Sequence, residues 1–410
     1  MTGEYDMHRS LSVLLITHYY EPEIGAAPRR MRSLVSRWRA RGVDVRVIAP
    51  LPHYPQGRAL DGYGFRQIGS SWGRYGEKVT RTPFLPIERG GVAKLADHIV
   101  SAAAAISPAL VGPRPDVVIA SVPAVPTMGA ALVAARRWRA PLVLDMRDSW
   151  PDVAVEAGMA EGPVGRALVS FVSSIQRAAD VIVTVPPGFA EVLATRGIPA
   201  GRIHHVPNGT DVDGVPYQDP PPQVTRRLRV LYCGTHGVSQ GLETVVRAIA
   251  AVGHSRVEGR FIGEGTEKRS LIDLARSLGA PITFEDAVPR EKVWEAYAWA
   301  DTCLVPLRAL PSFKDAVPSK IYEIMASGRH VLACLEGEAE RVIGAARAGI
   351  VVPPENEPAL TEALRHLACH RDELLVGAGP RAWVRANRDD DALADAFYDV
   401  LERAATARRR

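Results

Sequence analysis

The chain has 410 residues and a formal net charge of +4 at pH 7, with 47% hydrophobic and 23% charged residues. This length is too great for one compact core and about right for two domains. The hydrophobic content excludes a largely disordered chain, and with so small a net charge we expect no nucleic-acid partner.

Apolar runs that alternate with helical segments make up the first half of the chain. Strands are expected at residues 12–17, 43–49, 116–121, 141–145 and 180–185, and helices at residues 128–138 and 164–179. The longest apolar stretch, residues 92–111, is interrupted by Lys94, Asp97 and His98, so it predicts a buried or half-buried helix rather than a membrane span. The alternation predicts a doubly wound parallel sheet.

An arginine-rich segment lies between the first two strands. Residues 29–41 contain six arginines and no acid, and apolar residues recur among them at helical spacing. One interpretation is a basic helix resting near anionic lipid. The other, which we favour, is an amphipathic helix that turns Trp38 and its apolar neighbours toward the core.

A turn-rich stretch separates the two halves. Residues 207–222 are rich in proline, and a second alternating series follows them. Its strands are expected at residues 229–234, 260–263, 281–284, 302–306, 330–334 and 349–352, with helices at 242–251, 268–278 and 289–299. We therefore expect a Rossmann-like domain over residues 1–207, a linker over 208–223 and a second Rossmann-like domain over 224–385. Residues 386–410 predict a final helix, for which packing against the N-terminal domain is one arrangement.

The segment Asp315–Gly328, D-A-V-P-S-K-I-Y-E-I-M-A-S-G, is the most informative of the chain. It places two carboxylates, Asp315 and Glu323, eight positions apart around an expected helix start. Pro318 suits the first turn of that helix because its missing N–H would be unpaired there anyway. Gly328 suits the helix end.

This helix start and two glycine loops are suited to binding a phosphate group. The first-turn N–H groups, helped by Ser319 and Lys320, can hold an anion such as a diphosphate. Glycines follow two expected strands of the same half, at Gly234, Gly237, Gly263 and Gly265. Ligands of open parallel sheets bind beyond the carboxyl ends of the strands, where all these residues are expected. Lys268 is a second candidate cation, although a solvated helix residue is an equally good interpretation.

Other polar clusters favour ordinary structural roles. Asp211 and Asp213 form a D-x-D in the linker, where Asp favours turns. His366 and His370 keep H-x-x-x-H spacing but lack the general-base Glu of a metalloprotease, so a solvated helix face is expected. The four cysteines form no C-x-x-C pair, and the N-terminus shows no signal-peptide pattern. We expect no metal, no cofactor and a cytoplasmic protein.

Five segments resemble motifs of the retaining glycosyltransferases of family 4. Asp315–Gly328 resembles the E-x7-E region, and His18–Ala27 resembles the N-terminal glycine loop. Asn208–Asp211, N-G-T-D, resembles the hinge motif, and Tyr232–Gly237 and Phe261–Gly265 resemble the two donor-side glycine loops. The resemblance covers nearly the whole chain and implies the GT-B fold, in which two Rossmann-like domains face each other across a cleft. It is strongest to a branch with P-S-K-x-x-E, which includes bacterial transferases of amino sugars in surface polysaccharide assembly.

The resemblance implies roles for the donor-side residues. Glu323 matches the glutamate that binds the nucleotide ribose, and Asp315 stands where a glutamate contacts the donor sugar. Many relatives carry a cation after the first donor-side glycine loop, where this chain has Ser239-Gln240-Gly241. Lys320 is expected to supply that charge.

The resemblance also points to residues of the first half. Gly25 belongs to the N-terminal glycine loop, and His53 and Tyr54 belong to a loop near the acceptor. Asp148, in D-M-R-D-S-W-P, could orient the acceptor hydroxyl or the donor sugar. A helix N-cap is an equally good interpretation of Asp148.

Taken together, these motifs predict transfer of a sugar, of N-acetylhexosamine type, from a UDP-linked donor to a hydroxyl with retention. The partners expected are a nucleotide-diphosphate sugar and a hydroxyl acceptor, either a lipid-linked glycan or a small molecule. With a lipid-linked acceptor, the protein would act peripherally at the inner face of the membrane. Three alternatives stay open: a transferase of aminocyclitol or nucleoside antibiotic biosynthesis, a sugar-nucleotide epimerase of the same fold, and a nucleotide-binding scaffold without activity.

Overall fold

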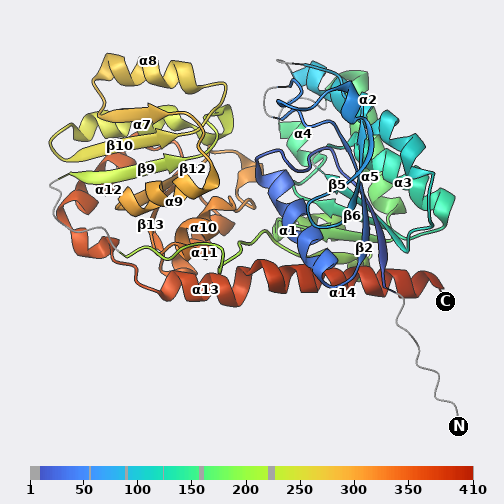
Figure 1. Cartoon of the computed structure of the whole chain (residues 1–410). Coiled ribbons are helices and arrows are strands. Elements are labelled where there is room, and N and C mark those ends of the chain that lie inside the picture. The colour runs from blue at the N-terminus through green and yellow to red at the C-terminus, as the bar shows by residue number, and fades with distance from the viewer. Residues whose placement is uncertain are drawn as a thin grey trace, which may run out of the picture. The chain divides into compact units, whose positions relative to one another are not determined.

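The computed structural model describes residues 10–54, 57–87, 91–122, 124–156, 161–219 and 227–409. It divides into two compact units, each built around its own sheet (Figure 1). The first unit runs to Pro207 and resumes at Asp391, and the second runs from Asn208 to Asp390. The chain therefore leaves its first unit and later returns to it.

The sheet of the first unit has eight strands among the described residues, in the order β3-β4-β2-β1-β5-β6-β7-β8. Neighbouring strands pair in parallel, except that β3 is antiparallel to β4. Helices cover both faces, which explains why the central strands are continuous apolar runs. The strands are β1 Ser12–Ile16, β2 Asp44–Pro50, β3 Gly69–Trp72, β4 Lys78–Thr82, β5 Val117–Val122, β6 Leu142–Met146, β7 Val181–Thr184 and β8 Ile203–His205.

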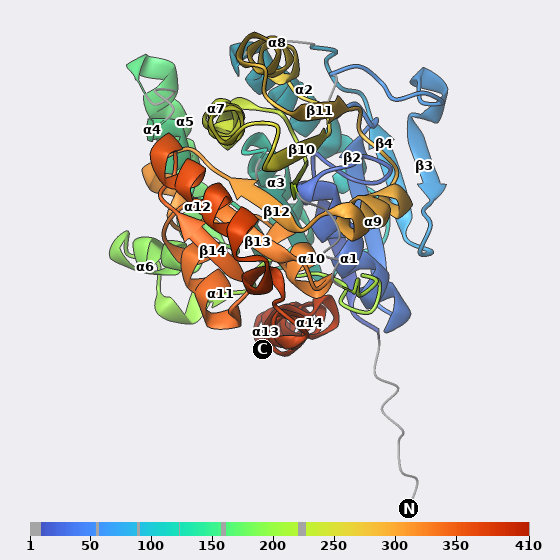
Figure 2. The same ribbon diagram turned by 90° about the vertical axis from the view of Figure 1, so that its left-hand side faces the viewer.

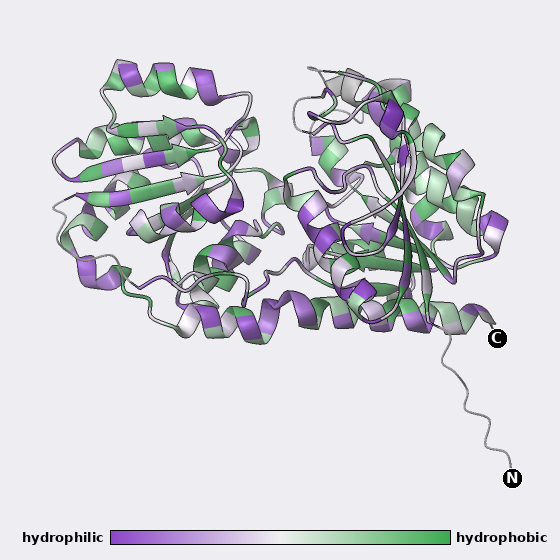
Figure 3. Ribbon diagram, in the orientation of Figure 1, coloured by the Kyte–Doolittle hydropathy of each residue, from purple (hydrophilic) through white to green (hydrophobic). Residues whose placement is uncertain are grey.

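Two hydrophobic clusters cover the faces of this sheet. Side chains of α1 and α14 belong to one cluster, and those of α2, α3, α5 and α6 belong to the other. The helices and short 3₁₀ turns are α1 Ala26–Ala40, η1 Phe65–Gln67, α2 Gly91–Ala109, α3 Pro126–Trp138, α4 Asp152–Glu156, α5 Gly162–Ala178, α6 Gly188–Thr195, η2 Ala200–Arg202 and α14 Asp390–Arg409. Figure 3 shows the strands of this sheet as mainly apolar and α14 as mixed, as expected of a helix with one buried side.

The arginine-rich helix α1 packs into the core. Its apolar side is buried at Met31, Leu34, Val35 and Trp38. The Trp38 indole N–H donates to the carbonyl of Ala394 on α14 at 3.2 Å, and the ion pairs Arg37–Asp391 and Arg41–Asp395 join the same two helices. These contacts support the amphipathic interpretation of α1. No helix in the described part of the chain is long and apolar enough to span a bilayer.

The sheet of the second unit is parallel throughout, in the order β11-β10-β9-β12-β13-β14. Side chains of α7, α8 and α12 cover one face, and those of α9, α10 and α11 cover the other (Figure 2). The strands are β9 Leu228–Cys233, β10 Val257–Ile262, β11 Ile282–Glu285, β12 Thr302–Pro306, β13 His330–Cys334 and β14 Gly349–Val352. The helices and short turns are η3 Val238–Gln240, α7 Leu242–Val252, α8 Lys268–Leu278, α9 Arg290–Trp299, η4 Pro311–Phe313, α10 Lys320–Ala326, α11 Glu338–Ala346, α12 Glu357–Cys369, η5 Arg371–Leu374 and α13 Gly379–Arg388.

The stretch expected as a linker is part of the second unit where the structure describes it. The Thr210 N–H donates to the Arg388 carbonyl at 3.0 Å, and the Asp390 N–H donates to the Thr210 carbonyl at 3.1 Å. Asp211 accepts the N–H of a turn and Asp213 pairs with Arg385, so both keep structural roles. Residues 220–223 lie outside the described residues. The second unit ends at Asp390 rather than at the expected residue 385, because α13 packs on α10 and α11.

Candidate active site

Two glycine loops meet at the carboxyl end of the second sheet. They are residues 234–237, after β9, and residues 263–265, after β10, and we call them the glycine loops. The Gly234 N–H donates to the Ile262 carbonyl at 2.9 Å. A Cβ on Gly263 would lie 1.9 Å from the Gly234 carbonyl oxygen, and one on Gly265 would lie 2.2 Å from the His236 carbonyl oxygen. The two backbones therefore come so close that no residue with a side chain fits at Gly263 or Gly265.

Lys320 lies beside the first glycine loop. Its ammonium group is 4.5 Å from the centre of the Tyr232 ring, and a Cβ on Gly234 would lie 2.5 Å from its Nζ atom. Desolvation lowers the pKa of Lys320 to about 8, although Cys233 and Glu323 act in the opposite direction. The absence of a side chain at Gly234 thus makes room for a cation at the end of β9.

Arg308 brings a second cation to the stretch that follows the first glycine loop. The resemblance left the stretch Ser239–Gly241 without a charge of its own. Arg308 follows β12, its N–H donates to the Ser239 carbonyl at 3.0 Å, and a Cβ on Gly241 would lie 3.3 Å from its Cγ atom. Its side chain is 3.8 Å from Glu355. This neighbour comes from a distant part of the sequence and was missed.

The helix that holds Lys320 is shorter than expected. It begins at Lys320, so Pro318 precedes the helix instead of forming its first turn. Ser319 occupies the N-cap position without a side-chain cap hydrogen bond. Gly328, with φ +78°, follows the helix end as expected. The expected anion site therefore depends more on the Lys320 side chain than on a helix start, since α10 has only 7 residues.

Glu323 lies one turn along α10 from Lys320, and its side chain is 18% exposed. The Arg290 guanidinium is 3.6 Å from its Oε1 atom and 5.3 Å from the centre of the Trp294 ring. Arg290 begins α9 and was not singled out from the sequence. It places a third cation near the segment that was expected to bind the donor.

Asp315 is half-buried in the loop between η4 and α10. The Glu338 N–H donates to the Lys314 carbonyl at 2.7 Å. Gly337 has φ +85°, and a Cβ there would lie 2.1 Å from the Lys314 carbonyl oxygen. The backbone is therefore anchored one residue before Asp315, which limits how far this loop can shift.

Lys268, the other candidate cation, is engaged by acids of its own unit. Its ammonium group is 3.0 Å from Glu264 and 2.6 Å from Asp286, and it donates to the Glu285 carbonyl at 3.0 Å. Burial would lower the pKa of Lys268, but these hydrogen bonds raise it overall. The structure thus gives Lys268 a role in holding the second glycine loop.

His236 is the least expected member of the glycine loops. It is fully buried, and its two ring nitrogens have no hydrogen-bond partner among the described residues. Desolvation lowers its pKa to about 4, with Lys268 and Lys320 adding to the effect. The rings of Tyr232, Phe284 and Phe261 lie 5.5, 6.1 and 6.4 Å away. His236 is therefore a neutral ring packed among aromatic residues.

The first unit contains a pocket of about 800 Å³, which we call the apolar pocket. It brings together Gly25, Tyr54 and Asp148, which were singled out separately from the sequence, with residues that the sequence did not single out. Its lining is mainly apolar and includes Tyr19, Ala26, Ala27, Pro28, Leu95, His98, Val125, Pro126, Arg147, Trp150, Glu161, Val164, Gly165 and Leu168.

Asp148 lines this pocket and is not a helix N-cap, because α4 begins four residues later at Asp152. Its side chain is exposed. Desolvation by the surrounding protein nevertheless raises the pKa of Asp148, while the adjacent Arg147 lowers it. A carboxylate beside a cation, at the edge of an apolar pocket, suits the orientation of a hydroxyl group.

His53 does not line the pocket. It is 4% exposed, its ring stacks on Phe84 with centres 4.4 Å apart, and its Nδ1 is 2.8 Å from the Leu51 carbonyl oxygen. Of the two residues expected near the acceptor, only Tyr54 lines the pocket. The Tyr54 ring packs against Gly25, where a Cβ would lie 3.2 Å from the ring.

Comparison with known proteins places both halves in the same enzyme class. Residues 25–209 match the family described as glycosyl transferase 4-like domain, and residues 227–370 match glycosyl transferases group 1. The chain is 24% identical over 389 residues to the putative colanic acid biosynthesis glycosyl transferase WcaI of Escherichia coli K12, covering 87% of this chain and 91% of that one.

Solved structures share the fold over almost the full length. Sucrose-phosphate synthase of Thermosynechococcus elongatus matches with a TM-score of 0.76 at 17% identity. The match covers 97% of this chain and 100% of the synthase chain. The Anabaena protein HepE in complex with UDP-glucose matches with a TM-score of 0.70 at 15% identity, covering 96% of this chain and 99% of that one. The two family matches, over residues 25–209 and 227–370, thus place the chain among the glycosyltransferases, and the solved structures show that it has the two-domain GT-B fold.

Proposed function

We propose that the protein is a retaining glycosyltransferase that moves a sugar of N-acetylhexosamine type from a UDP-linked donor to a hydroxyl group. The donor assignment depends mainly on the position of Lys320, whose ammonium group lies over the Tyr232 ring beside the glycine loops. A fixed cation there offsets the charge of a departing diphosphate without reorganisation of the site. The complex of HepE with UDP-glucose supports a UDP-linked donor.

Residues around Lys320 complete the proposed donor site. Glu323 accepts hydrogen bonds from the ribose hydroxyls, and Asp315, one methylene shorter than the glutamate of relatives, contacts the donor sugar directly or through water. The chemistry needs no metal ion, because the side chain of Lys320 supplies the positive charge. Retention and the amino sugar are proposed from the resemblance of the P-S-K-x-x-E segment.

The apolar pocket supports a choice of acceptor. Its volume of about 800 Å³ and its mainly apolar lining suit an acceptor with a hydrophobic portion. A lipid-linked glycan fits this lining, and the name of the relative WcaI, a putative colanic acid biosynthesis glycosyl transferase, supports a role in polysaccharide assembly. The protein would then work peripherally at the inner face of the membrane, with Asp148 orienting the acceptor hydroxyl.

One screen tests the assignment. Nucleotide sugars are ranked by the rise they cause in the thermal midpoint of the full chain, since a ligand that binds only the folded state raises stability. The best donor is then incubated with lipid-linked and soluble acceptors, and the anomeric configuration of the product is read by NMR. We expect a UDP sugar to rank first and the product to retain configuration.

Each alternative has its own outcome in this screen. Inversion in the product refutes retention, and loss of donor binding in EDTA refutes metal-free binding of the diphosphate. A changed sugar stereocentre with donor alone indicates an epimerase, whereas turnover only with an aminocyclitol or nucleoside indicates a small-molecule transferase. Donor binding without turnover on any acceptor indicates a scaffold.

A further inference from the structure

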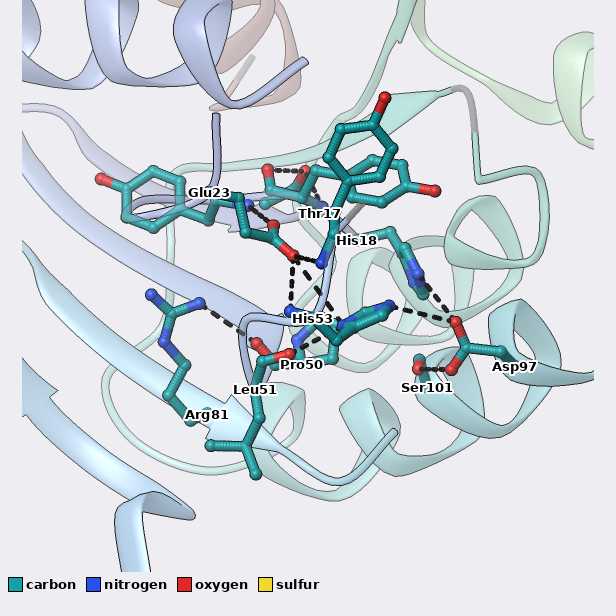
Figure 4. Close-up of polar contacts among 12 residues, drawn as sticks. Thr17, His18, Glu23, Pro50, Leu51, His53, Arg81, Asp97 and Ser101 are labelled. Carbon is teal, nitrogen blue, oxygen red and sulfur yellow. Dashed lines mark hydrogen bonds and ion pairs between the residues drawn. The ribbon is translucent and has the colours of Figure 1, made fainter. Parts of the chain in front are cut away.

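Three buried side chains of the first unit, His18, His53 and Asp97, converge at one point (Figure 4). His18 lies in the loop after β1, His53 in the loop after β2 and Asp97 on α2. Their exposures are 2%, 4% and 5%. The Nε2 atom of each histidine lies 3.2 Å from the same oxygen, Oδ2 of Asp97. One ligand atom from each residue lies within 4.8 Å of the other two.

These distances fit the edges of a coordination tetrahedron. Bonds of about 2.0–2.1 Å from a zinc ion to nitrogen and oxygen place neighbouring ligand atoms roughly 3.3 Å apart. The two separations of 3.2 Å between imidazole nitrogen and carboxylate oxygen are close to that value. Two imidazoles and one carboxylate are also a common ligand set for such an ion, with the fourth position left open.

The remaining atoms of the ligands are held in place. The Nδ1 atom of His53 is 2.8 Å from the Leu51 carbonyl oxygen, and Oδ1 of Asp97 accepts from the Leu85 N–H at 3.0 Å and from the Ser101 hydroxyl at 3.2 Å. Such partners orient ligand atoms toward a metal and make an imidazole a better ligand. They leave Nε2 of His53 and Oδ2 of Asp97 directed at a common point.

Either a proton or a metal ion lies between Nε2 of His53 and Oδ2 of Asp97. Nδ1 of His53 carries a proton, because the carbonyl oxygen that it faces can only accept. In the neutral ring Nε2 presents a lone pair, and two acceptors 3.2 Å apart need a cation between them. Glu23, the other acid near His53, is occupied by the backbone N–H groups of Tyr20, His53 and Tyr54.

We propose that His18, His53 and Asp97 form a binding site for a divalent transition-metal ion, with zinc favoured by the ligand set. The ion joins the loops after β1 and β2 to α2. The residues next to these ligands, Tyr19, Tyr54 and His98, line the apolar pocket. The ion would hold the pocket walls together. Because its ligands all belong to the first unit, this proposal stands independently of the donor assignment in the second unit.

Cobalt(II) is the probe of choice, because tetrahedral cobalt gives intense visible absorption. The full chain is stripped of metal, titrated with Co²⁺ and compared with two variants. We expect one equivalent of Co²⁺ to produce tetrahedral bands in the unmodified protein, and Asp97→Asn to weaken binding roughly 100-fold or more. The amide oxygen that this substitution introduces can still accept the Leu85 N–H, which favours retention of the fold.

The matched control is the other close histidine pair. His366 and His370 stack on α12 with ring centres 4.1 Å apart and lie at the surface, with His366 2.9 Å from Glu373. The double variant H366Q/H370Q should bind cobalt as the unmodified protein does. If this variant loses the bands and D97N keeps them, metal binds at the surface pair and the proposal is overturned.

A stability measurement covers the case in which D97N fails to fold. Zn²⁺ should raise the thermal midpoint of the metal-free full chain in a concentration-dependent manner. Ser101→Ala, which removes only an outer hydrogen bond, should weaken metal binding about tenfold. If the unmodified protein shows neither cobalt bands nor a zinc-dependent midpoint, the cation is a proton shared by an imidazolium and Asp97, and the metal site is refuted.

Discussion

The glycine loops of the second unit and the apolar pocket of the first unit keep their shapes in different ways. The loops are held by backbone contacts that leave no room for a Cβ at Gly263 or Gly265, and a lysine lies beside them. The pocket is walled by side chains such as Tyr54, Val125 and Leu168, which other apolar residues could replace. The glycine loops therefore tolerate little change, whereas the apolar pocket can vary in sequence and keep its apolar character.

The largest effect is expected at Gly263. Replacing it with Ala puts a Cβ 1.9 Å from the Gly234 carbonyl oxygen, at φ +145°. We expect the free energy of unfolding of the second unit to fall by about 3–5 kcal/mol, measured by urea denaturation. Gly237→Ala is the control, since its φ is −121° and its nearest neighbour is a flexible Gln240 side chain. Equal losses of unfolding free energy in the two variants would contradict the view that close contact between the two loop backbones excludes a side chain at Gly263.

Lys320→Met tests whether the charge at the loops binds the donor. Loss of a charged hydrogen-bond donor should weaken binding of the best nucleotide sugar by about 1.5–3 kcal/mol in calorimetry, or roughly 10- to 150-fold. Lys268→Met is the matched control, because that ammonium group is already engaged by Glu264 and Asp286. If Lys268→Met weakens donor binding more than Lys320→Met does, the two assignments must be exchanged.

The comparison also explains which parts of the site could be predicted from sequence. Strands buried on both faces are continuous apolar runs, so β1, β5, β9 and β12 were located to within a residue or two. Lys320 and Glu323 lie on one short segment, where local spacing already brings them together. Gly234 and Gly263 were found because each ends a strand, although their reason, contact between two backbones, needs the tertiary structure.

Residues that meet only through tertiary contacts were missed. His18, His53 and Asp97 come from three elements, and no spacing in the sequence relates them. Arg308 reaches Ser239, and Arg290 reaches Glu323, from the ends of other elements. His53 was expected in a loop near the acceptor, yet it is 4% exposed and its ring stacks on Phe84, a residue distant in sequence.

Two buried histidines predict acid sensitivity of the second unit. Burial lowers the pKa of His236 and of His330 to about 4, below the value of the unfolded chain. The unfolded state then binds more protons between pH 6.5 and 4, so this contribution to stability is complete above pH 6.5 and is lost as pH falls. At pH 5 each histidine therefore lowers the free energy of unfolding by about 2 kcal/mol relative to its value at neutral pH. His330→Gln, which can keep a hydrogen bond to Thr302, should lessen the fall measured by urea denaturation at pH 7 and pH 5. An unchanged fall would refute the assignment.

The pH dependence of donor binding provides a further test of Lys320. Its pKa of about 8 means that donor affinity should be constant below pH 8 and fall above it, approaching tenfold per pH unit, or about 1.4 kcal/mol. The dissociation constant of the donor is measured from pH 6.5 to pH 9.5. Lys320→Arg keeps the charge and should remove the dependence. A dependence that persists in the arginine variant must come from another group.

The smallest effect is expected in the apolar pocket, where Val164 is 73% exposed at the rim. Val164→Asp places a charge against apolar walls, so the affinity for an apolar fluorescent probe should fall roughly tenfold. Stability and donor binding should hardly change, because the side chain is exposed and belongs to the other unit. Val111→Asp is the control, since Val111 is 64% exposed and does not line the pocket. If Val164→Asp leaves probe binding intact, the pocket does not select apolar ligands, and the argument for a lipid-linked acceptor loses its structural support.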